Sequence, residues 1–547
     1  MGAGAVVGPR FDRRGCPARK GFSVSGASRF GSARGSGEDD PVLPVIPTSL
    51  VEVDVVRRPR DGVPTAVPLP DGESGPELAP VAEAFEVDIA LLEAIGVKSA
   101  AGDVRTVPLP EGRFGWVVGI GSGEAAQWRT AGAALARATR EKLGETGEAE
   151  GDTVDFGEPS EAEYLQIRLP AGIGQDAVSA LALGLALGDY RFRVTGQPAP
   201  PRLRKALLVT DDEELREPVA RAREWAAATA LARDLANSPS NVKDPDWFTG
   251  LAARLAGEVD GLTATVRDEK WLADHGFGGI LAVGGGSASP PRLLELAWRP
   301  ADATGPHLVL VGKGITFDTG GISLKPAEGM HLMRTDMSGG AAVIGAMLAV
   351  ARLGLRVRVT ALVPSAENHL SGSSYRPGDV VRHYGGKTTE VGNTDAEGRM
   401  VMADALVYGV RHHEADLLVD VATLTGAMKV ALGLRTGGVF ATDPDLSRRL
   451  RDAGDRVGEA WWPMPLIEDH TEAVRGELAD VNQTPPGPGG VTAALFLREF
   501  TEGLPWAHLD IAGPARADKN YAEVVAGGTG FAARSLVEFV ASLAEQG

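Results

Sequence analysis

Short apolar runs alternate with longer amphipathic or alanine-rich stretches along most of the chain, starting near residue 45. In the second half these runs are unbroken, as is typical of strands buried on both faces of a sheet. The pattern predicts strands over Leu308–Val311, Val357–Pro364, Leu417–Leu424 and Ala507–Ile511. It predicts helices over Ser338–Leu353, Arg399–His412, Thr492–Phe500 and Gly530–Leu543. This alternation favours an α/β domain with a mostly parallel sheet.

The first half of the chain repeats the alternation with shorter elements. It predicts strands over Phe114–Ile120 and Ala206–Thr210, and helices over Ala125–Lys142 and Val178–Leu187. A long stretch rich in Ala, Arg and Leu, Glu217–Ala236, predicts a helix that joins two domains.

The predicted fold is therefore α/β with two domains, each a mostly parallel or mixed sheet flanked by helices, joined by a long helix. Residues 1–44, rich in Gly, Ser and Arg, are expected to be a disordered N-terminal tail. We expect an N-terminal α/β domain over 45–212, a linker helix over 213–237, and a catalytic α/β domain over 238–547.

Charge and cysteine content narrow the function. The net charge of −18 argues against nucleic acid as the main partner, because such a surface repels phosphate backbones. The single cysteine, Cys16, excludes a disulfide within the chain and a cysteine-based zinc site. No apolar run approaches the roughly 20 residues that span a bilayer, so we expect a cytoplasmic protein without a membrane partner.

Several common catalytic signatures are absent. The nine histidines form no His-Glu-x-x-His spacing, and no Gly-x-Ser-x-Gly elbow occurs. A phosphate-binding loop is missing too, because Gly312-Lys313-Gly314 continues into Ile315. The usual signatures of serine hydrolases, cysteine hydrolases and P-loop enzymes are thus all missing.

Charged residues instead gather in three loops at predicted strand ends or before predicted helices, over 312–326, 333–340 and 393–399. The loops carry two lysines and four carboxylates: Lys313, Lys325, Asp318, Asp336, Asp395 and Glu397. If 393–399 is extended, Asp395 and Glu397 project to the same side. The ordinary alternatives are a helix N-cap for Asp336 or Asp395, and a surface position for Lys325.

Four carboxylates that share one crevice repel each other unless cations neutralise them. Divalent metals do this most simply, and oxygen ligands suit Zn, Mn or Mg. A lysine can join such a shell only as a neutral amine, and nearby metal ions would lower its pKa enough to permit that.

The same loops closely resemble the leucyl (cytosol) aminopeptidase family. The segment Asn393-Thr394-Asp395-Ala396-Glu397-Gly398-Arg399 matches its signature without a mismatch. The sequences around Tyr375–Asp379, Ala422–Ala427 and Trp506–Gly513 agree as well. The resemblance covers essentially all of the second domain, whereas the first domain is similar only in architecture.

The resemblance implies a role for each residue. Asp318 and Glu397 would bridge two divalent metal ions, Mn or Zn. Lys313 and Asp336 would complete the exchangeable site, and Asp395 the other one. Lys325 and Arg399 would form a catalytic pair, with Arg399 holding a bicarbonate ion that acts as general base. Residues that would line the substrate pocket, where a plain core position is the alternative, are Met333, Thr423, Leu424, Gly426 and Ala512.

The implied activity is removal of N-terminal amino acids, with a Leu-type preference, from peptides that carry a free N-terminus. A metal-bound hydroxide would attack the peptide carbonyl. The family also implies a homohexamer. Three alternatives stay open: an additional DNA-binding role, known for some bacterial members; a catalytically inactive scaffold; and hydrolysis of another bond, such as a phosphodiester.

Overall fold

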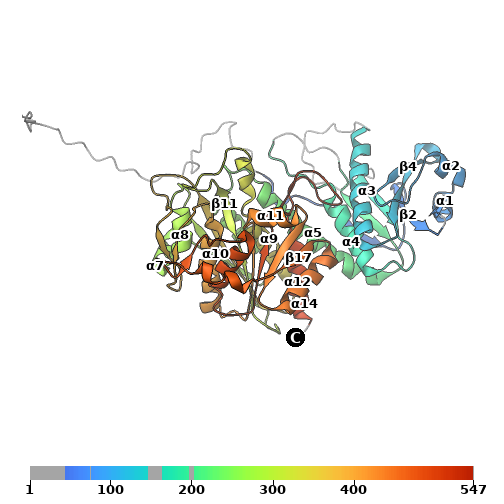
Figure 1. Cartoon of the computed structure of the whole chain (residues 1–547). Coiled ribbons are helices and arrows are strands. Elements are labelled where there is room, and N and C mark those ends of the chain that lie inside the picture. The colour runs from blue at the N-terminus through green and yellow to red at the C-terminus, as the bar shows by residue number, and fades with distance from the viewer. Residues whose placement is uncertain (1–43, 74, 146–162, 196–201, 546–547) are drawn as a thin grey trace, which may run out of the picture. The chain divides into compact units, whose positions relative to one another are not determined.

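The computed structural model describes residues 44–73, 75–145, 163–195 and 202–545 (Figure 1). The predicted tail over 1–44 lies outside the described residues except for its last one. Residues Leu43–Gly547 belong to one compact unit. Within this unit the chain builds two large sheets.

The first half forms a mixed seven-stranded sheet with the order β1-β7-β6-β2-β5-β4, to which β3 adds beside β2. Its strands are β1 (Glu52–Val56), β2 (Thr65–Gly72), β3 (Gly75–Pro76), β4 (Val104–Pro108), β5 (Phe114–Gly121), β6 (Tyr164–Arg168) and β7 (Lys205–Val209). The helices are α1 (Leu78–Phe85), α2 (Ile89–Ala94), α3 (Ala125–Glu145) and α4 (Gln175–Leu187). Strands β4 and β3 run antiparallel to their neighbours, and the other pairs are parallel.

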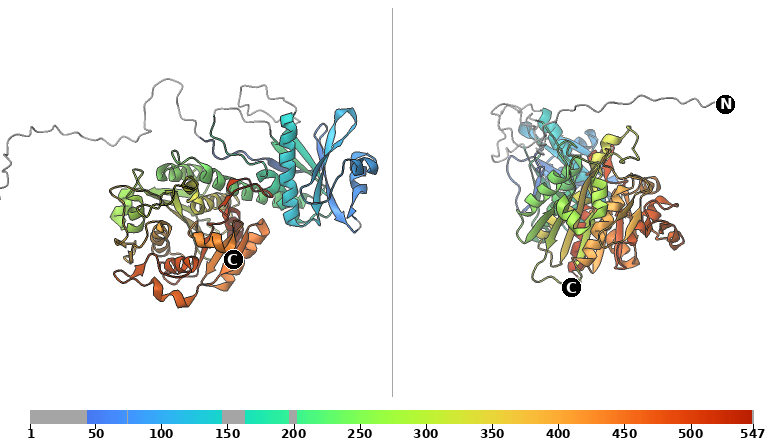
Figure 2. Two further views of the ribbon diagram at one scale, coloured as in Figure 1. Left: turned by 45° about the horizontal axis from the view of Figure 1, so that its top comes forward. Right: turned by 90° about the vertical axis from the view of Figure 1, so that its left-hand side faces the viewer.

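The second half forms a nine-stranded sheet with the order β17-β16-β19-β15-β10-β12-β9-β8, and β11 pairs with β12. Its strands are β8 (Leu262–Arg267), β9 (Arg292–Trp298), β10 (Leu308–Gly312), β11 (Gly314–Asp318), β12 (Val359–Asn368), β15 (Leu417–Ala422), β16 (Thr436–Ala441), β17 (Ala460–Met464) and β19 (Trp506–Asp510). The central strands β12, β10, β15 and β19 are parallel, so their carboxyl ends meet at one edge. The right-hand view of Figure 2 shows strands of this sheet running side by side.

Helices cover both faces of the larger sheet. Leu308 and Leu310 of β10 join the core formed with α9 (Ser338–Arg352) and α14 (Ala533–Ala544). Val309 and Val311 face the other way, into a core with α8 (Gly278–Gly284), α10 (Glu397–Arg411) and α13 (Gly489–Arg498). This explains why the strand sequence is apolar at every position. The remaining helices are α6 (Pro245–Ala256), α7 (Glu269–His275), α11 (Gly426–Leu432) and α12 (Pro444–Val457).

The predicted joining helix is α5 (Arg216–Asn237), which packs against α4 of the first half and α9 of the second. One continuous core cluster contains residues of both halves together with the buried face of α5. The fold class is therefore confirmed as α/β with two flanked sheets. The boundaries at 212 and 237 stay a prediction.

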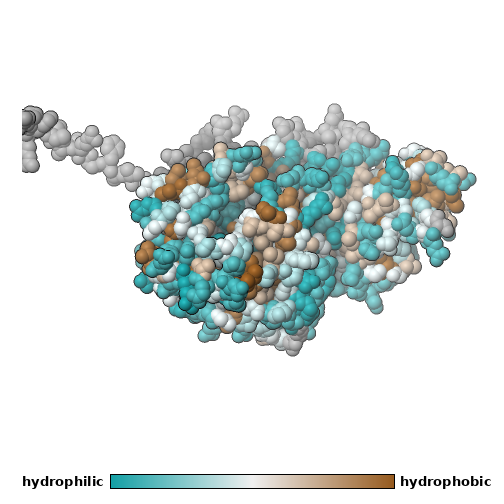
Figure 3. Space-filling view, viewed as in Figure 1, coloured by the Kyte–Doolittle hydropathy of each residue, from teal (hydrophilic) through white to brown (hydrophobic). Residues whose placement is uncertain are grey.

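Short strands form two smaller sheets: β13 (Val380–Arg382), β14 (Thr388–Glu390) and β18 (Val481–Asn482) in one, β20 (Arg516–Ala517) and β21 (Gly527–Gly528) in the other. Most of the face drawn in Figure 3 is hydrophilic, with hydrophobic residues in small separate groups. No helix of the described residues combines the length and apolar character needed to cross a bilayer.

One local expectation was wrong. Asn393–Ala396 forms a turn and Glu397 is the first residue of α10, so Asp395 and Glu397 do not lie on one extended segment. The N-cap alternative was wrong as well. The N-cap positions of α9 and α10 are Met337 and Ala396, and neither helix has a side-chain cap. Asp336 and Asp395 are therefore free to act elsewhere.

Candidate metal centre

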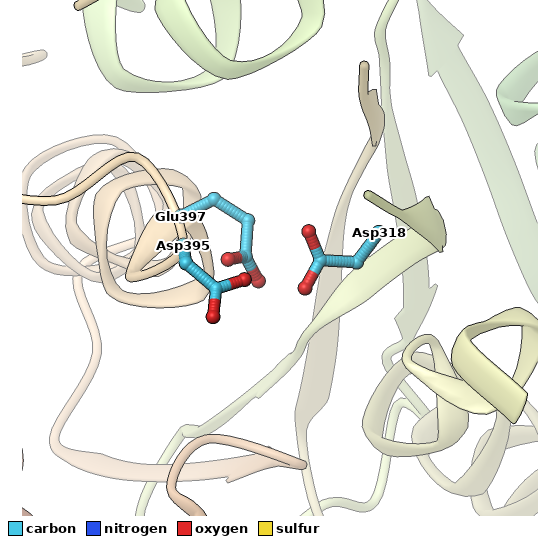
Figure 4. Close-up of side chains that lie close together, drawn as sticks. All are labelled: Asp318, Asp395 and Glu397. Carbon is cyan, nitrogen blue, oxygen red and sulfur yellow. The ribbon is translucent and has the colours of Figure 1, made fainter. Parts of the chain in front are cut away.

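The charged loops meet at the carboxyl edge of the larger sheet. Lys313 lies between β10 and β11, and Asp318 ends β11. Asp336 follows a short 3-10 helix, η4 (Met330–Thr335), directly before α9. Figure 4 shows that Asp318, Asp395 and Glu397 point toward one another from two different elements. One carboxylate oxygen from each lies within 4.8 Å of those of the other two.

Lys313 is the centre of the buried half of the site. Its Nζ lies 2.8 Å from Asp336 Oδ2 and 2.8 Å from Glu397 Oε1, and it donates to Thr423 O at 3.0 Å. A glycine at position 398 makes room for this side chain, because a Cβ there would lie 2.6 Å from Lys313 Cε. The two loops are thus locked together through one ammonium group.

Lys325 is the corresponding cation of the more open half. Its Nζ lies 2.7 Å from Asp318 Oδ2 and forms an ion pair with Asp395. Gly320, at φ +85°, turns the chain in a conformation that favours glycine, and a Cβ there would lie 2.9 Å from Asp395 Oδ1. In this structure Lys325 therefore contacts two of the predicted ligands.

Electrostatics show an excess of negative charge. Burial raises the pKa of Asp318, and the nearby Glu397 raises it further. Burial likewise raises the pKa of Asp336 well above its usual value, although Lys313 opposes this. Burial alone would lower the pKa of both lysines, but the surrounding carboxylates outweigh it and raise the pKa of each. Added positive charge would relieve this repulsion.

The donor set fits divalent cations. Among the described residues, buried Glu397 Oε2 has no hydrogen-bond partner, so one ligand atom is available without breaking a contact. Four carboxylates converge on two ammonium groups, those of Lys313 and Lys325. Oxygen-rich sites of this kind suit Mn, Zn and Mg.

Arg399, the other predicted catalytic residue, is buried behind this cluster. Its Nη1 donates to Gln483 O at 2.6 Å, and its guanidinium carbon lies 5.8 Å from the centre of the Phe496 ring. The Nε atom has no hydrogen-bond partner. Burial lowers the pKa of Arg399 to about 10, which leaves the group charged at neutral pH.

The predicted pocket residues come from η4, from the segment between β15 and α11 with the first residue of α11, and from the segment after β19. Thr423 Oγ1 donates to Asp336 Oδ1 at 2.7 Å, so this residue contacts a predicted ligand directly. Leu424 N and Ala512 N both donate to Asp510 Oδ1, at 3.3 and 3.0 Å. Met333 lies in η4, where its carbonyl accepts from Asp336 N, and Gly426 begins α11.

Sequence reasoning missed two supporting residues. Asn368 Nδ2 donates to Asp318 Oδ1 and to Thr394 O, both at 2.9 Å, and so ties the two acidic loops together. Asp510 accepts hydrogen bonds from Leu424 N and Ala512 N and so joins the loops after β15 and β19. Both end a central strand of the sheet. A polar residue that closes an apolar strand is the signal that could have found them.

The carboxylate cluster lies at the carboxyl edge of the parallel central strands, which is where α/β sheets bind their ligands, and this placement suits a metal-dependent enzyme. Comparison with known proteins gives the class of the protein. Residues 230–537 match the family described as "Cytosol aminopeptidase family, catalytic domain", and the chain belongs to this family. It is therefore a metal-dependent aminopeptidase, which uses divalent metal and hydrolyses peptides at the N-terminus.

Relatives match along most of the chain. A probable cytosol aminopeptidase of Streptomyces coelicolor is 42% identical in an alignment of 514 residues, which covers 87% of this chain and 95% of that protein. Another, from Syntrophotalea carbinolica, is 45% identical over 381 residues, covering 68% of this chain and 76% of the relative.

Solved structures agree with the fold. The bottromycin maturation enzyme BotP in complex with Mn matches with a TM-score of 0.75 and 38% identity, covering 88% of this chain and 99% of that chain. A tomato leucine aminopeptidase mutant matches with a TM-score of 0.79 and 27% identity, covering 92% of this chain and 98% of that chain.

Proposed function

We propose that this aminopeptidase holds two divalent cations, Mn or Zn, and prefers a leucine-type residue at the peptide N-terminus. The observation that carries the proposal is the approach of Asp318, Asp395 and Glu397 oxygens to within 4.8 Å of one another. The named neighbours support both parts: one solved structure is described as an Mn complex, and another as a leucine aminopeptidase.

The proposed ligand roles are those that the family resemblance implies. Asp318, which contacts Lys325, and Glu397, which contacts Lys313, would bridge the cations. Lys313 and Asp336 would complete the exchangeable site, which requires the lysine to lose its proton. Asp395 would complete the second site. When bound, the two cations would supply Lewis acidity and lower the pKa of a shared water.

The protein groups around the cations would orient the peptide. Asp336 is placed to accept a hydrogen bond from a free α-amine, so that a blocked N-terminus would bind poorly. Lys325, once released from Asp318 and Asp395, can donate to the oxyanion that develops on the scissile carbonyl. Arg399 has a free Nε that can hold bicarbonate. The first side chain of the peptide would lie among Met333, Thr423, Leu424, Gly426 and Ala512.

A matrix of metals and substrates tests the proposal. We expect chelation to abolish hydrolysis of leucine amide, and Mn or Zn to restore it. The matching N-acetylated substrate should not be cleaved, because its nitrogen cannot contact the exchangeable site. Full activity after exhaustive metal removal would contradict the proposal.

Metal counting tests the ligand roles separately. Wild-type protein should bind two Mn ions per chain, and Lys313→Ala should lose one of them preferentially. Two ions bound to Lys313→Ala at normal affinity would exclude this lysine as a ligand.

We also propose a cytoplasmic homohexamer. The location is supported by the relatives, which are named cytosol aminopeptidases, whereas the hexamer is what the family resemblance implies. Light scattering after gel filtration should give a mass close to six chains, and a monomer at working concentration would contradict the assembly.

A further inference from the structure

A second buried lysine, outside the acidic cluster, has no carboxylate among its hydrogen-bond partners. Lys243 follows α5 and precedes α6, and its side chain is completely buried. Its Nζ donates to Leu235 O at 2.8 Å, to Ala236 O at 3.2 Å and to Arg334 O at 2.6 Å. A fourth and longer contact reaches Met337 Sδ at 3.4 Å. An ammonium group has three donors, and the three carbonyl oxygens are its nearest acceptors.

The position explains how a lysine is held there. Leu235 and Ala236 belong to the last turn of α5, where carbonyls lack partners within the helix and carry the negative end of its dipole. Burial lowers the pKa of Lys243 well below that of an ordinary lysine, and Arg334 lowers it further. The carbonyls oppose this effect, because all three hydrogen bonds can form only with the charged amine.

The third carbonyl connects Lys243 to the metal centre. Arg334 lies in η4, two residues before Asp336. Asp336 N donates to Met333 O at 3.2 Å. The hydrogen bond from Lys243 to Arg334 O therefore holds the same turn of backbone that orients the Asp336 carboxylate. That carboxylate lies 2.8 Å from Lys313.

We propose that Lys243 is a positioning residue that fixes η4 against the end of α5 and thereby sets the metal affinity of the site containing Asp336. The proposal rests on the proposed function, because it takes Asp336 as a metal ligand. Without Lys243, three buried carbonyls lose their donor and the end of η4 loses its only tie to the α5 carbonyls among the hydrogen bonds of the described residues.

The test uses the full-length Lys243→Met, which keeps an unbranched side chain, one atom shorter, and removes the three donors. We expect Mn to bind about tenfold more weakly at one of the two sites. This is the lower end of the range of affinity losses seen when a group that orients a metal ligand is removed. Amide hydrogen exchange over residues 330–337 should become faster. Asp336→Asn identifies the affected site, because it should weaken the same one.

Matched variants separate positioning from general stability. Lys243→Gln keeps a donor and should give an intermediate effect; it also serves if the methionine variant does not fold. Lys205→Met removes a lysine that pairs with Glu52 and Asp54 in the first sheet, and it should leave Mn binding and the exchange over 330–337 unchanged.

The outcomes distinguish the two proposals. If the wild type binds fewer than two Mn ions, the proposed function fails. Amide hydrogen exchange over residues 330–337, measured on metal-free protein, still decides the role of Lys243. A lower melting temperature with unchanged Mn affinity and unchanged exchange over 330–337 would overturn the positioning role.

Discussion

Two buried clusters of charge in this molecule are built on opposite principles. The acidic cluster is the candidate metal centre, where four carboxylates face two ammonium groups. The arginine cluster joins α3 of the first half to α14 and its neighbours, and comprises Arg129, Glu459, Glu523 and Arg534. It has equal numbers of cations and anions.

The partners of the carboxylate oxygens show the difference. Glu523 Oε1 lies 2.7 Å from Arg534 Nη2, and Glu523 Oε2 lies 3.2 Å from Arg129 Nε. Glu459 Oε1 lies 3.5 Å from Arg534 Nε, and its Oε2 accepts from Ser535 Oγ at 2.5 Å. In the acidic cluster, by contrast, Glu397 Oε2 is buried without a partner.

The pKa directions agree with this contrast at Glu523 but not at Glu459, whose pKa is raised by burial even though Arg534 opposes the effect. Burial would raise the pKa of Glu523, but Arg534 and Arg129 outweigh it and lower the pKa below the usual value. The pKa of Asp336 is raised by burial and by neighbouring carboxylates despite Lys313. Removing one partner from the balanced cluster would leave an uncompensated buried charge, whereas the unbalanced cluster has the perturbed carboxylates typical of a functional site.

The largest effect should follow from removing a charge from the acidic cluster. Glu397→Gln keeps the shape of the side chain but loses a proposed bridging ligand. We expect kcat/KM on leucine amide to fall roughly a thousandfold, the upper end for loss of one group acting on the transition state. Titration with Mn should show that one or both ions are lost.

The control for Glu397→Gln is its stability without metal. Lys313 retains Asp336 as a partner, and the removed charge repels Asp318. The free energy of unfolding should therefore change less than in a variant of the arginine cluster. Normal activity in Glu397→Gln would contradict its role as a ligand.

The arginine cluster should give the next largest effect, and on stability rather than on catalysis. Glu523→Gln leaves Arg129 and Arg534 facing each other in a buried place. We expect a loss of about 3 kcal/mol in the free energy of unfolding, as for other broken buried ion pairs. Urea unfolding measures this loss, and kcat of the folded variant should stay near that of the wild type.

A double-variant cycle sharpens this second test. Arg129→Met combined with Glu523→Gln should cost less than the sum of the single variants, because the two groups contact each other. Arg448→Met removes an exposed ion pair with Asp445 and should be nearly neutral. Strict additivity of Arg129→Met and Glu523→Gln would show that their contact contributes nothing.

The sequence predicted the acidic cluster far better than the arginine cluster, and the reason is the separation along the chain. Lys313, Asp318 and Lys325 lie within one short segment, 313–325, and Asp395 and Glu397 are close neighbours in another, so short motifs identify them. Arg129 lies on α3 in the first half of the chain, and Glu523 lies in the second half, 394 positions further on. No local pattern connects them.

The same argument explains which parts of the fold were predictable. Unbroken apolar runs located β10 and β15 to within one or two residues at most ends. The order of the strands, the Thr423–Asp336 contact and the place of Asn368 depend on pairing between distant segments. The position of Glu397 on a helix rather than on an extended segment depended on the turn at 393–396, whose geometry the residue pattern left open.

The smallest effect should come from a third buried pair, in which the cation is a histidine that loses its charge as the pH rises. Asp420 Oδ1 lies 2.5 Å from His508 Nδ1, and Trp506 Nε1 donates to Asp420 Oδ2 at 2.7 Å. Burial would lower the pKa of His508, but Asp420, with help from Asp510 and against Arg399, raises it above the usual value.

The sign of the pH dependence follows from that shift. A histidine whose pKa is raised by folding stabilises the protein fully below the pKa of the unfolded chain, about 6.5, and loses this contribution as the pH rises through the folded value. The difference in melting temperature between wild type and His508→Gln should therefore shrink with increasing pH in metal-free buffer. His331→Gln, on an exposed position, serves as the control. A difference that grows with pH would show that His508 is neutral in the folded protein, and that Asp420 lies with Trp506 in a polar pair instead of an ionic one.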